Sequence, residues 1–256
     1  MELIFHYDKP PAGETAFGLA PERYRREYWR CLTCGHFVAA NAFDLEELYA
    51  GAYMEATYTG DVTATFERIM ALPRERSDNA GRARRIVAHW GAHRPACERT
   101  LLDVGSGLGV FPARMKEEGW QCTALDPDPG ATRHARERIG IAAVEGDFMT
   151  QGELGRFGLV TFNKVLEHVE DPIDMLARSR DLLLDGGIAY VEVPDGELAA
   201  LDSDGPEREE FFVEHLHVFS AASVALLATR AGFTTRSLER LREPSDKYTL
   251  FGFLEA

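Results

Sequence analysis

Residues 101–111 read LLDVGSGLGVF, an apolar run that ends in an aspartate, three glycines at alternate positions and the beginning of a helical pattern. Glycine lets the main chain approach a ligand closely, and the first N–H groups of a helix have no partner within the helix. In open α/β sheets, ligands bind at such turns beyond the carboxyl ends of the strands. The segment therefore predicts an α/β fold with a ligand site at Gly105, Gly107 and Gly109.

Short apolar runs alternate with amphipathic segments after this glycine turn. Because parallel neighbours in a sheet need a crossover connection, the alternation predicts a mostly parallel sheet with helices on both faces. The last two apolar runs, 234–241 and 247–256, predict an antiparallel hairpin at the end of that sheet. Ser77 or Asp78, and later Ser220, are expected to begin helices, since their side chains can cap a first turn.

The spacing of the glycines bears on the class of ligand. The dinucleotide fingerprint is G-x-G-x-x-G, whereas Gly105, Gly107 and Gly109 form G-x-G-x-G, which disfavours a pyrophosphate cradle. Asp126 ends the next strand about 20 residues further on, where a carboxylate can accept hydrogen bonds from ribose hydroxyls. This aspartate indicates an adenosine ligand, but it fits nicotinamide dinucleotides and S-adenosylmethionine alike.

Five motifs together resemble the class I S-adenosylmethionine-dependent methyltransferases, over residues 75–256. LLDVGSGLG resembles the first motif of that family, ALDPDP the second, EGDF the third and FNKVLEHVEDP the fourth, and LLLDGGIAYVEVP resembles the region of the fifth strand. Each motif alone is weak, but their order and spacing agree. The resemblance implies a Rossmann-like sheet of seven strands with helices on both faces, S-adenosylmethionine as cofactor, and methyl transfer as the reaction.

The resemblance also implies roles for single residues. The glycine loop would receive the methionine part of the cofactor with Asp103 holding the loop, and Asp126 would bind the ribose. Asp147 and the amide of Phe148 would recognise adenine, although an aspartate at that place can instead cap a turn. Asn163 would close over the cofactor. The complete expected set is Asp103, Gly105, Ser106, Gly107, Gly109, Asp126, Pro127, Asp147, Phe148 and Asn163.

Two segments offer a histidine as a base, which methyl transfer needs only if the acceptor must lose a proton. The stretch FFVEHLHVFS resembles deoxysugar C-methyltransferases, in which the corresponding histidine is the proposed base. That resemblance makes His215 the candidate base and Glu214 the group that orients or activates it. His168, which follows the fourth strand, is a second candidate base, and its counterpart in the family is often a wall of the pocket.

The same stretch leaves other interpretations open. If it is extended, His215 and His217 share one face and Glu214 lies on the other. Both histidines could then be packing residues under a lid, which is the alternative to a catalytic role. Phe212 stands where the sugar enzymes use a tyrosine, and this departure argues against C-methylation in particular.

Residues 1–75 are expected to form an amino-terminal cap that selects the acceptor, and residues 76–256 the cofactor-binding domain. Tyr53 or Tyr58 are expected to contact the acceptor or to pack the cap.

Within this cap, Cys31 and Cys34, followed by Gly35, have the spacing of a zinc knuckle. A structural zinc site needs four ligands, and the second Cys-x-x-Cys of the sugar enzymes is missing upstream in this chain. His6 and His36 are the nearest substitutes. A zinc site and a metal-free turn therefore remain alternatives.

The formal charge of −14 makes binding to polyanions less favourable through long-range repulsion. It disfavours nucleic acid, and the two basic clusters, RYRREYWR and RARR, have the mixed pattern of solvated faces. No apolar run is long enough to span a membrane and no leader pattern is visible at the start, so a cytoplasmic protein is expected.

The combined expectation is S-adenosylmethionine-dependent methylation of a small-molecule acceptor, with no assignment of oligomeric state. A nucleotide-linked sugar or a related biosynthetic intermediate is the leading acceptor class, by resemblance. The nearest alternative is an O- or N-methyltransferase for another metabolite, such as a quinone precursor. Two further alternatives belong to other classes: a non-catalytic module that binds an adenosine ligand, and a nicotinamide-dependent oxidoreductase.

Overall fold

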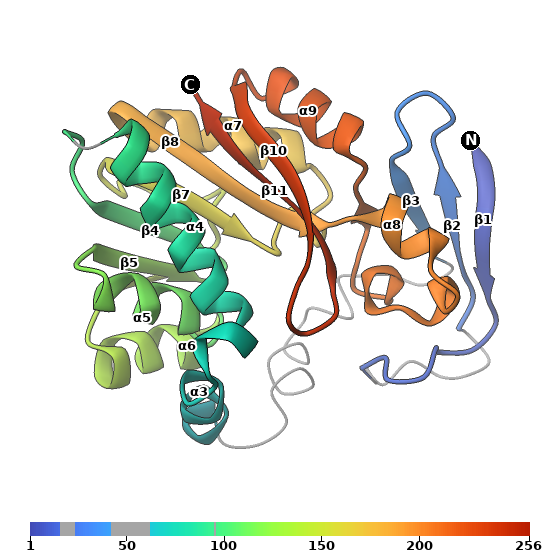
Figure 1. Ribbon diagram of the computed structural model, residues 1–256, viewed down its shortest axis with the longest axis horizontal. Coiled ribbons are helices and arrows are strands. Elements are labelled where there is room, and N and C mark those ends of the chain that lie inside the picture. Colours follow the sequence, from blue (N-terminus) through green and yellow to red (C-terminus); the bar gives the residue numbers. More distant parts are fainter. Residues whose placement is uncertain (16–23, 42–61, 95) are drawn as a thin grey trace.

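The computed structural model describes residues 1–15, 24–41, 62–94 and 96–256. Its main sheet has seven strands in the order β10-β11-β8-β7-β4-β5-β6, which confirms the expected α/β fold (Figure 1). Strands β8, β7, β4, β5 and β6 are parallel, and the β10–β11 hairpin at the edge is antiparallel, as predicted. The strands are β4 (Thr100–Val104), β5 (Gln121–Asp126), β6 (Ala142–Glu145), β7 (Phe157–Asn163), β8 (Leu183–Pro194), β10 (Thr234–Arg242) and β11 (Tyr248–Glu255).

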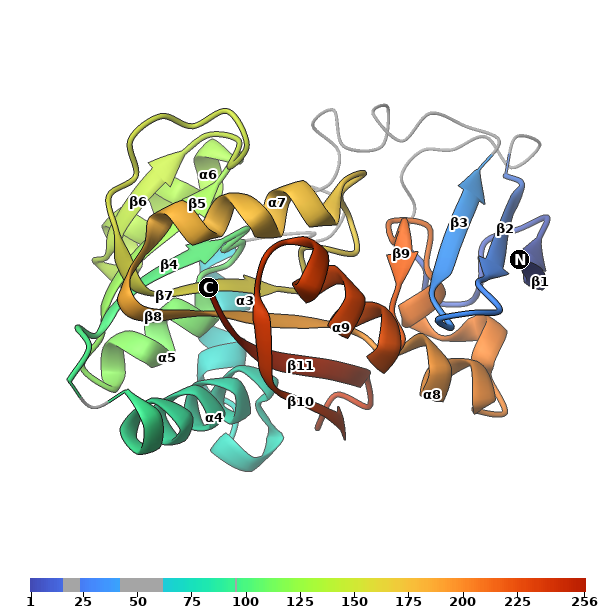
Figure 2. The same cartoon turned by 90° about the horizontal axis from the view of Figure 1, so that it is seen from above.

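Helices cover both faces of this sheet (Figure 1 and Figure 2). Ser77 caps α4 and Ser220 caps α9 through hydrogen bonds to the first-turn amides, which confirms both predicted helix starts. The helices are α3 (Val62–Met70), α4 (Asp78–His93), α5 (Val110–Glu117), α6 (Pro129–His134), α7 (Pro172–Arg178), α8 (Gly196–Leu201) and α9 (Ala221–Arg230). Shorter helical turns are η2 (Arg74–Arg76), η3 (Ala135–Ile139), η4 (Ser179–Leu182), η5 (Gly205–Glu207) and η6 (Glu209–Phe211).

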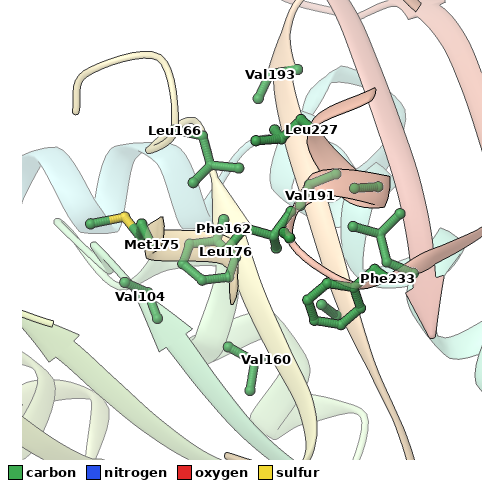
Figure 3. Packing of buried hydrophobic residues seen from close by; sticks show 14 of the residues in the cluster. Val104, Val160, Phe162, Leu166, Met175, Leu176, Val191, Val193, Leu227 and Phe233 are labelled. Atoms are coloured by element: carbon green, nitrogen blue, oxygen red, sulfur yellow. The ribbon is translucent and has the colours of Figure 1, made fainter. Parts of the chain in front are cut away.

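Two apolar clusters fill the layers on either side of the sheet. One joins α4 and α5 to the sheet around Ile86, Trp90 and Met115. The other joins α7 and α9 to the opposite face, where Met175 packs near Phe162 of β7 (Figure 3). Every residue of β7 except the last is buried, as a central parallel strand between two helical layers requires. The core therefore fixes the carboxyl ends of β4, β5 and β7 at one edge of the sheet.

A second, four-stranded antiparallel sheet has the order β1-β2-β3-β9. Three of its strands, β1 (Glu2–Tyr7), β2 (Arg26–Arg30) and β3 (Phe37–Asn41), come from the amino-terminal part. The fourth, β9 (His217–Val218), comes from the connection after β8 and pairs with β3. A buried cluster around Tyr28 and Phe211 joins this sheet to the same connection. The cap and the cofactor-binding part, which we divide at residue 75 from the sequence, thus share a sheet and a core.

A buried arginine stabilises this junction. Arg26 is 1% exposed, and its guanidinium donates to Glu14 Oε1 at 2.7 Å and to the main-chain oxygen of Phe211. It also lies over the ring of Tyr7, 4.0 Å from the centroid. The prediction that the two basic clusters are solvated faces is therefore wrong for Arg26, and also for Arg82, which is 7% exposed. Both cations are buried because carboxylates from distant parts of the chain pair with them.

The Cys31–Cys34 segment forms the tight turn between β2 and β3. Gly35 has a φ of 73°, and its amide donates to the Cys31 oxygen at 2.9 Å. Hydrogen bonds from Cys34 and Thr33 hold the pKa of the Cys31 thiol at about 7, which favours a thiolate.

The expected substitute ligands do not join this turn. His36 bonds to His217 and Ser223, and His6 bonds to Asp8. Within the described residues, the only group of three or more residues that could hold a metal ion lies elsewhere and contains no cysteine. Among the described residues, the thiols therefore have no further ligands that would complete a structural zinc site.

No helix in the described ranges combines the length and the apolar character needed to cross a bilayer.

The Arg26–Glu14 pair makes a testable contribution to stability. Arg26→Met leaves a buried carboxylate without its cation, and we expect the free energy of unfolding to fall by about 3–5 kcal/mol. The double variant Arg26→Met/Glu14→Gln removes both charges and should recover much of that loss. Urea denaturation followed by tryptophan fluorescence measures both effects. An unchanged unfolding midpoint for Arg26→Met would contradict this role.

The incomplete ligand set of the Cys31–Cys34 turn predicts a metal-free protein. Metal analysis of the purified protein should find less than about half an equivalent of zinc, and a chelator should leave the unfolding transition unchanged. One full equivalent of zinc, together with an unfolding temperature that a chelator lowers, would contradict this prediction and show that the Cys31–Cys34 turn binds zinc.

Candidate active site

The glycine loop after β4 adopts a conformation that only glycine supports easily. Gly105, Gly107 and Gly109 have φ values of 66°, 51° and 69°. A Cβ on Gly105 would lie 2.7 Å from Cγ2 of Val165, and a Cβ on Gly109 would collide with the side chain of Ile139. Left-handed torsion angles and close packing therefore both require glycine here. Because glycine has no side chain, the loop can present its main-chain atoms to a ligand in the cavity.

Asp126, at the end of β5, lies directly against this loop. Its carboxylate accepts hydrogen bonds from the amide of Gly107 at 2.8 Å and from the amide of Asp128 at 2.9 Å. Burial raises the pKa of this carboxyl, while the two amides favour its charged form. Pro127 lines the cavity beside it. The carboxylate thus reaches the loop from the neighbouring strand, as the sequence predicts for a group near the ribose.

Asp103 and Asn163 join the ends of β4 and β7. The Asp103 carboxylate accepts from Thr161 Oγ1 and from Asn163 Nδ2, each at 2.7 Å, and its main-chain oxygen accepts from Ser106 Oγ. Asn163 Oδ1 is buried and has no partner among the described residues. It lies at the cavity wall, so a ligand there could donate a hydrogen bond to it.

Asp147 follows β6 and uses one carboxylate oxygen to close a turn. Oδ1 accepts from the amides of Met149 and Thr150 at 2.8 and 3.0 Å. Asp147 therefore caps a turn, which is the alternative role that the sequence allows for it. Phe148, 2% exposed, packs edge-on against Phe162 and lines the cavity. Turn capping occupies Oδ1, and adenine recognition by Asp147 stays a prediction.

A single cavity of about 1040 Å³ connects the glycine loop to the cap. It is large enough for a nucleoside cofactor and a small acceptor together, since pockets for drug-sized ligands measure about 300–1,000 Å³. All the residues expected to bind the cofactor line this cavity, and so do His168, Glu214 and His215. Cys31 and Cys34 do not line it.

The two candidate bases lie side by side in this cavity. The rings of His168 and His215 are 4.9 Å apart. Nδ1 of His215 bonds to the main-chain oxygen of Glu210, and Nδ1 of His168 bonds to that of Glu214, each at 2.9 Å. Because a carbonyl oxygen can only accept, both Nδ1 atoms carry the proton and both Nε2 atoms carry a lone pair. Burial lowers the pKa of His168 to about 4, and burial with the neighbouring His168 lowers that of His215 well below its usual value, so both rings are neutral near pH 7.

The local backbone corrects one expectation about this stretch. Residues 213 and 214 form a turn between bends at 212 and 216, so the stretch is not one continuous strand and His215 and His217 do not share a face. His215 faces the cavity, whereas His217 stacks on His36 at 5.2 Å in the cap. The group that orients His215 is the Glu210 carbonyl, and Glu214 contributes its own carbonyl to His168. Burial raises the pKa of the Glu214 carboxyl to about 7, and a direct role of that carboxyl stays a prediction.

Glu167 adds an acidic group to the two histidines. Potential ligand atoms of Glu167, His168 and His215 all lie within 4.8 Å of one another. Glu167 is completely buried, and neither carboxylate oxygen has a hydrogen-bond partner in the described part of the chain. Burial raises its pKa to about 7, although Lys164 opposes the rise. These three side chains, here named the Glu-His-His cluster, could accept hydrogen bonds from an acceptor or contact a cation.

Several charged residues that line the cavity were not predicted as site residues, among them Lys164 and Glu192. Lys164 has a φ of 60°, and its Nζ donates to Thr249 Oγ1 at 2.8 Å. Glu192 interrupts the buried strand β8 and is paired with Arg82 and Arg85. Lone charges inside apolar runs, such as the glutamate in IAYVEVP, are the signal that could have identified them, because a buried charge needs a partner.

Known proteins of similar sequence identify the family of this chain. The methyltransferase-domain family matches residues 64–238. A ubiquinone biosynthesis O-methyltransferase of Caulobacter vibrioides is 33% identical over 143 residues, which are 53% of this chain and 52% of the relative. A cypemycin N-terminal methyltransferase of a Streptomyces species is 31% identical over 117 residues, 43% of this chain and 48% of the relative. The chain thus spans about half the length of the curated relatives it matches.

Solved structures share the fold at lower identity. The 1,6-didemethyltoxoflavin-N1-methyltransferase of Burkholderia thailandensis has a TM-score of 0.58 at 21% identity, with 88% of this chain and 97% of that chain covered. A glycopeptide N-methyltransferase has a TM-score of 0.54 at 17% identity, with 69% and 90% covered. The family match covers most of the chain and includes the glycine loop, β5, β6 and β7. The chain belongs to the class I S-adenosylmethionine-dependent methyltransferases.

Proposed function

We propose that this enzyme methylates a small-molecule acceptor that enters between the cap and the cofactor loop, with His215 as its base. One observation carries the proposal. The glycine loop and a neutral, half-buried His215, whose Nε2 carries the lone pair, line the same cavity. Bound S-adenosylmethionine supplies a methyl group on a positively charged sulfur. The chain must then hold the acceptor in line and remove its proton where one has to leave.

The residues of the loop edge suit that cofactor. The backbone at Gly105 and Gly107 offers polar groups to the methionine part, and Asp126 offers a carboxylate to the ribose. The second carboxylate oxygen of Asp147 and the amide of Phe148 are available at the cavity for adenine. Asn163 Oδ1, buried and unpaired, fits a donor on the ligand.

His215 is suited to proton removal because its tautomer is set. Its Nδ1–H is engaged by the Glu210 carbonyl, so Nε2 presents the lone pair to the cavity. Since burial and His168 lower its pKa, the ring stays neutral and ready to accept a proton throughout the neutral pH range. His168 has the same tautomer, and we assign it to the wall that positions the acceptor.

The acceptor class rests on resemblance and on charge. The Glu214-His215 stretch favours a nucleotide-linked sugar or a related intermediate. The described lining contains eleven carboxylates and four basic side chains, so the sugar end fits the cavity better than its phosphates do. The relatives named for ubiquinone biosynthesis keep O-methylation of a quinone precursor as the alternative. Phe212, which lines the cavity without a hydroxyl, continues to disfavour C-methylation.

Asp126→Asn tests the cofactor assignment. Losing a charged acceptor for the ribose hydroxyls should raise the Kd for S-adenosylmethionine by about 10- to 100-fold. Titration calorimetry measures this Kd, with Glu145→Gln as the control, because Glu145 is exposed at the end of β6 and lies outside the cavity. Equal affinity of Asp126→Asn and the unmodified enzyme would remove Asp126 from the cofactor site.

His215→Gln tests the base. The variant should bind S-adenosylmethionine normally but lose about 100-fold or more in turnover, the usual scale for a positioned base. Transfer of a labelled methyl group into an extract of small metabolites provides the assay. His93→Gln is the matched control, because His93 is exposed on α4. If both variants turn over at the same rate, His215 takes no part in the reaction.

A further inference from the structure

The hydroxyl of Tyr28 reaches the main chain of the candidate base. Tyr28, in β2, is 0% exposed, and its hydroxyl lies 2.7 Å from the main-chain oxygen of His215 and 3.0 Å from that of Phe212. Since a phenol has one proton and a carbonyl oxygen can only accept, Tyr28 shares its proton between these two oxygens. A side chain of the cap thus bonds directly to the turn that carries His215.

Other contacts fix the main chain of His215 on both sides of this carbonyl. The His215 amide donates to the oxygen of Phe212 at 3.0 Å, which closes the turn. The next two amides, at 216–217, donate to the main-chain oxygen of Glu167 at 2.8 and 3.1 Å. The path of the chain through His215 is therefore set by β2, by the connection between β7 and α7, and by the turn itself.

The ring of His215 is attached to a different part of the molecule. Its Nδ1 bonds to the main-chain oxygen of Glu210 at 2.9 Å. The side chain of Glu210 is 2% exposed, and its Oε1 accepts from the amide of Tyr248, at the start of β11 in the main sheet, at 2.6 Å. The ring of His215 is thus held from the main sheet, whereas its carbonyl is held from the cap. The place of the imidazole in the cavity depends on both attachments.

Two further cap residues hold the chain just before the base. Glu14 Oε1 accepts from the amide of Val213 at 2.8 Å, and Arg26 donates to the main-chain oxygen of Phe211. Figure 1 shows the cap strands beside the connection between α8 and β9, to which these residues belong. Cap side chains therefore hold the main chain along 211–215, up to the base itself.

Among these cap contacts, the Tyr28 hydroxyl can be removed with the least change elsewhere. Arg26 and Glu14 form a buried ion pair, so changing either one leaves the other charge without its partner. Tyr28→Phe removes one oxygen and keeps the ring that packs edge-on against Tyr7 and Phe211. The effect of this variant can thus be assigned to the hydrogen bond.

We propose that Tyr28 is a positioning residue for methyl transfer, because its hydroxyl holds the carbonyl of His215 and thereby keeps the imidazole within reach of the acceptor. This inference rests on the proposed function, since it needs His215 to be the base. The cap then takes part in the reaction itself, in addition to selecting the acceptor. A base must come within about 2.6–3.2 Å of the atom that loses the proton, and a displacement of about 1 Å can lower a rate about 100-fold.

Tyr28→Phe tests this role in turnover. We expect the initial rate of labelled methyl transfer into an extract of small metabolites to fall about 10- to 100-fold. The Kd for S-adenosylmethionine should stay within about twofold, because the glycine loop makes no contact with the 211–215 turn. An unchanged rate would overturn the proposal.

Tyr7→Phe is the matched control for this variant. The hydroxyl of Tyr7 donates to the main-chain oxygen of Pro206 at 2.8 Å, and Tyr7 belongs to the same buried cluster as Tyr28. The control therefore loses one hydrogen bond of the same kind, but this bond does not involve the 211–215 turn. It should keep the rate of the unmodified enzyme. An equal loss of rate in both variants would show a general effect of the cap and overturn the role of Tyr28.

A double variant shows whether Tyr28 acts through His215. If the hydroxyl only positions the base, its removal costs nothing further once the base is absent. We therefore expect Tyr28→Phe/His215→Gln to have the rate of His215→Gln alone, within about twofold. A further loss as large as that of Tyr28→Phe in the unmodified enzyme would show an independent effect and contradict the proposal.

The pKa of His215 provides a readout that does not depend on turnover. Burial lowers this pKa well below its usual value, and the hydrogen bond to Glu210 opposes the fall. The other groups that act on this pKa or lie beside the ring are His168, Glu167 and Lys164 from the connection between β7 and α7, and Lys247 from the β10–β11 turn. Without the Tyr28 hydroxyl the turn is released and water reaches the ring, so the pKa should rise toward its usual value of about 6.5, by about one unit or more.

Nitrogen-15 NMR of histidine-labelled protein measures this pKa, and His215→Gln identifies the resonances. Tyr7→Phe should leave the titration of His215 unaltered. A loss of stability alone would lower the unfolding temperature of Tyr28→Phe without moving this pKa in the folded protein. An unchanged titration of His215 in Tyr28→Phe would therefore overturn the proposal, even with a lower rate.

The same measurements separate this inference from the proposed function. Full turnover in His215→Gln would refute the base, and the positioning role with it. Loss of turnover in His215→Gln together with full turnover in Tyr28→Phe would refute the positioning role alone, and the proposed base would stand.

Discussion

The rest of the site depends on the hydrogen bonds, here called the Asp103 tie, that join the end of β4 to the end of β7. The Asp103 carboxylate, 2% exposed, accepts hydrogen bonds from Thr161 and Asn163 at 2.7 Å. Burial raises its pKa to about 6, and these two donors oppose the rise because they stabilise the charged form. The order of strands reverses between β4 and β7, so their connections separate at this point. The Asp103 tie therefore sets the distance between the glycine loop and residues 164–168, and with it the width of the cavity.

Main-chain carbonyls orient the histidines on the far side of the cavity. Glu210 and Glu214 offer their backbone oxygens to His215 and His168, so each ring is held by a group whose hydrogen-bonding role does not change with pH. The same turns direct His217 away from the cavity and into the cap sheet, where it pairs with β3. One short connection thus builds the acceptor side of the site and attaches the cap to it.

The features predicted from sequence are those that short stretches determine. The glycine turn at 101–111, the helix caps, the mostly parallel sheet and the terminal hairpin follow from local patterns, and the predicted cofactor residues line one cavity. The burial of Arg26 and Arg82 was missed because their partners, Glu14 and Glu192, are 12 and 110 residues away in the chain. The contribution of β9 to the cap sheet was missed for the same reason. A pattern of charges shows which residues need partners, and only the fold brings those partners within reach.

Burial favours the neutral forms of the titratable side chains on the far side of the cavity. It lowers the pKa of His168 and His215, raises that of Glu167 to about 7, and lowers that of Lys164. Each shift moves the group toward its neutral form, since a low-dielectric site penalises charge of either sign. The same environment strengthens any hydrogen bond that a guest donates to these groups.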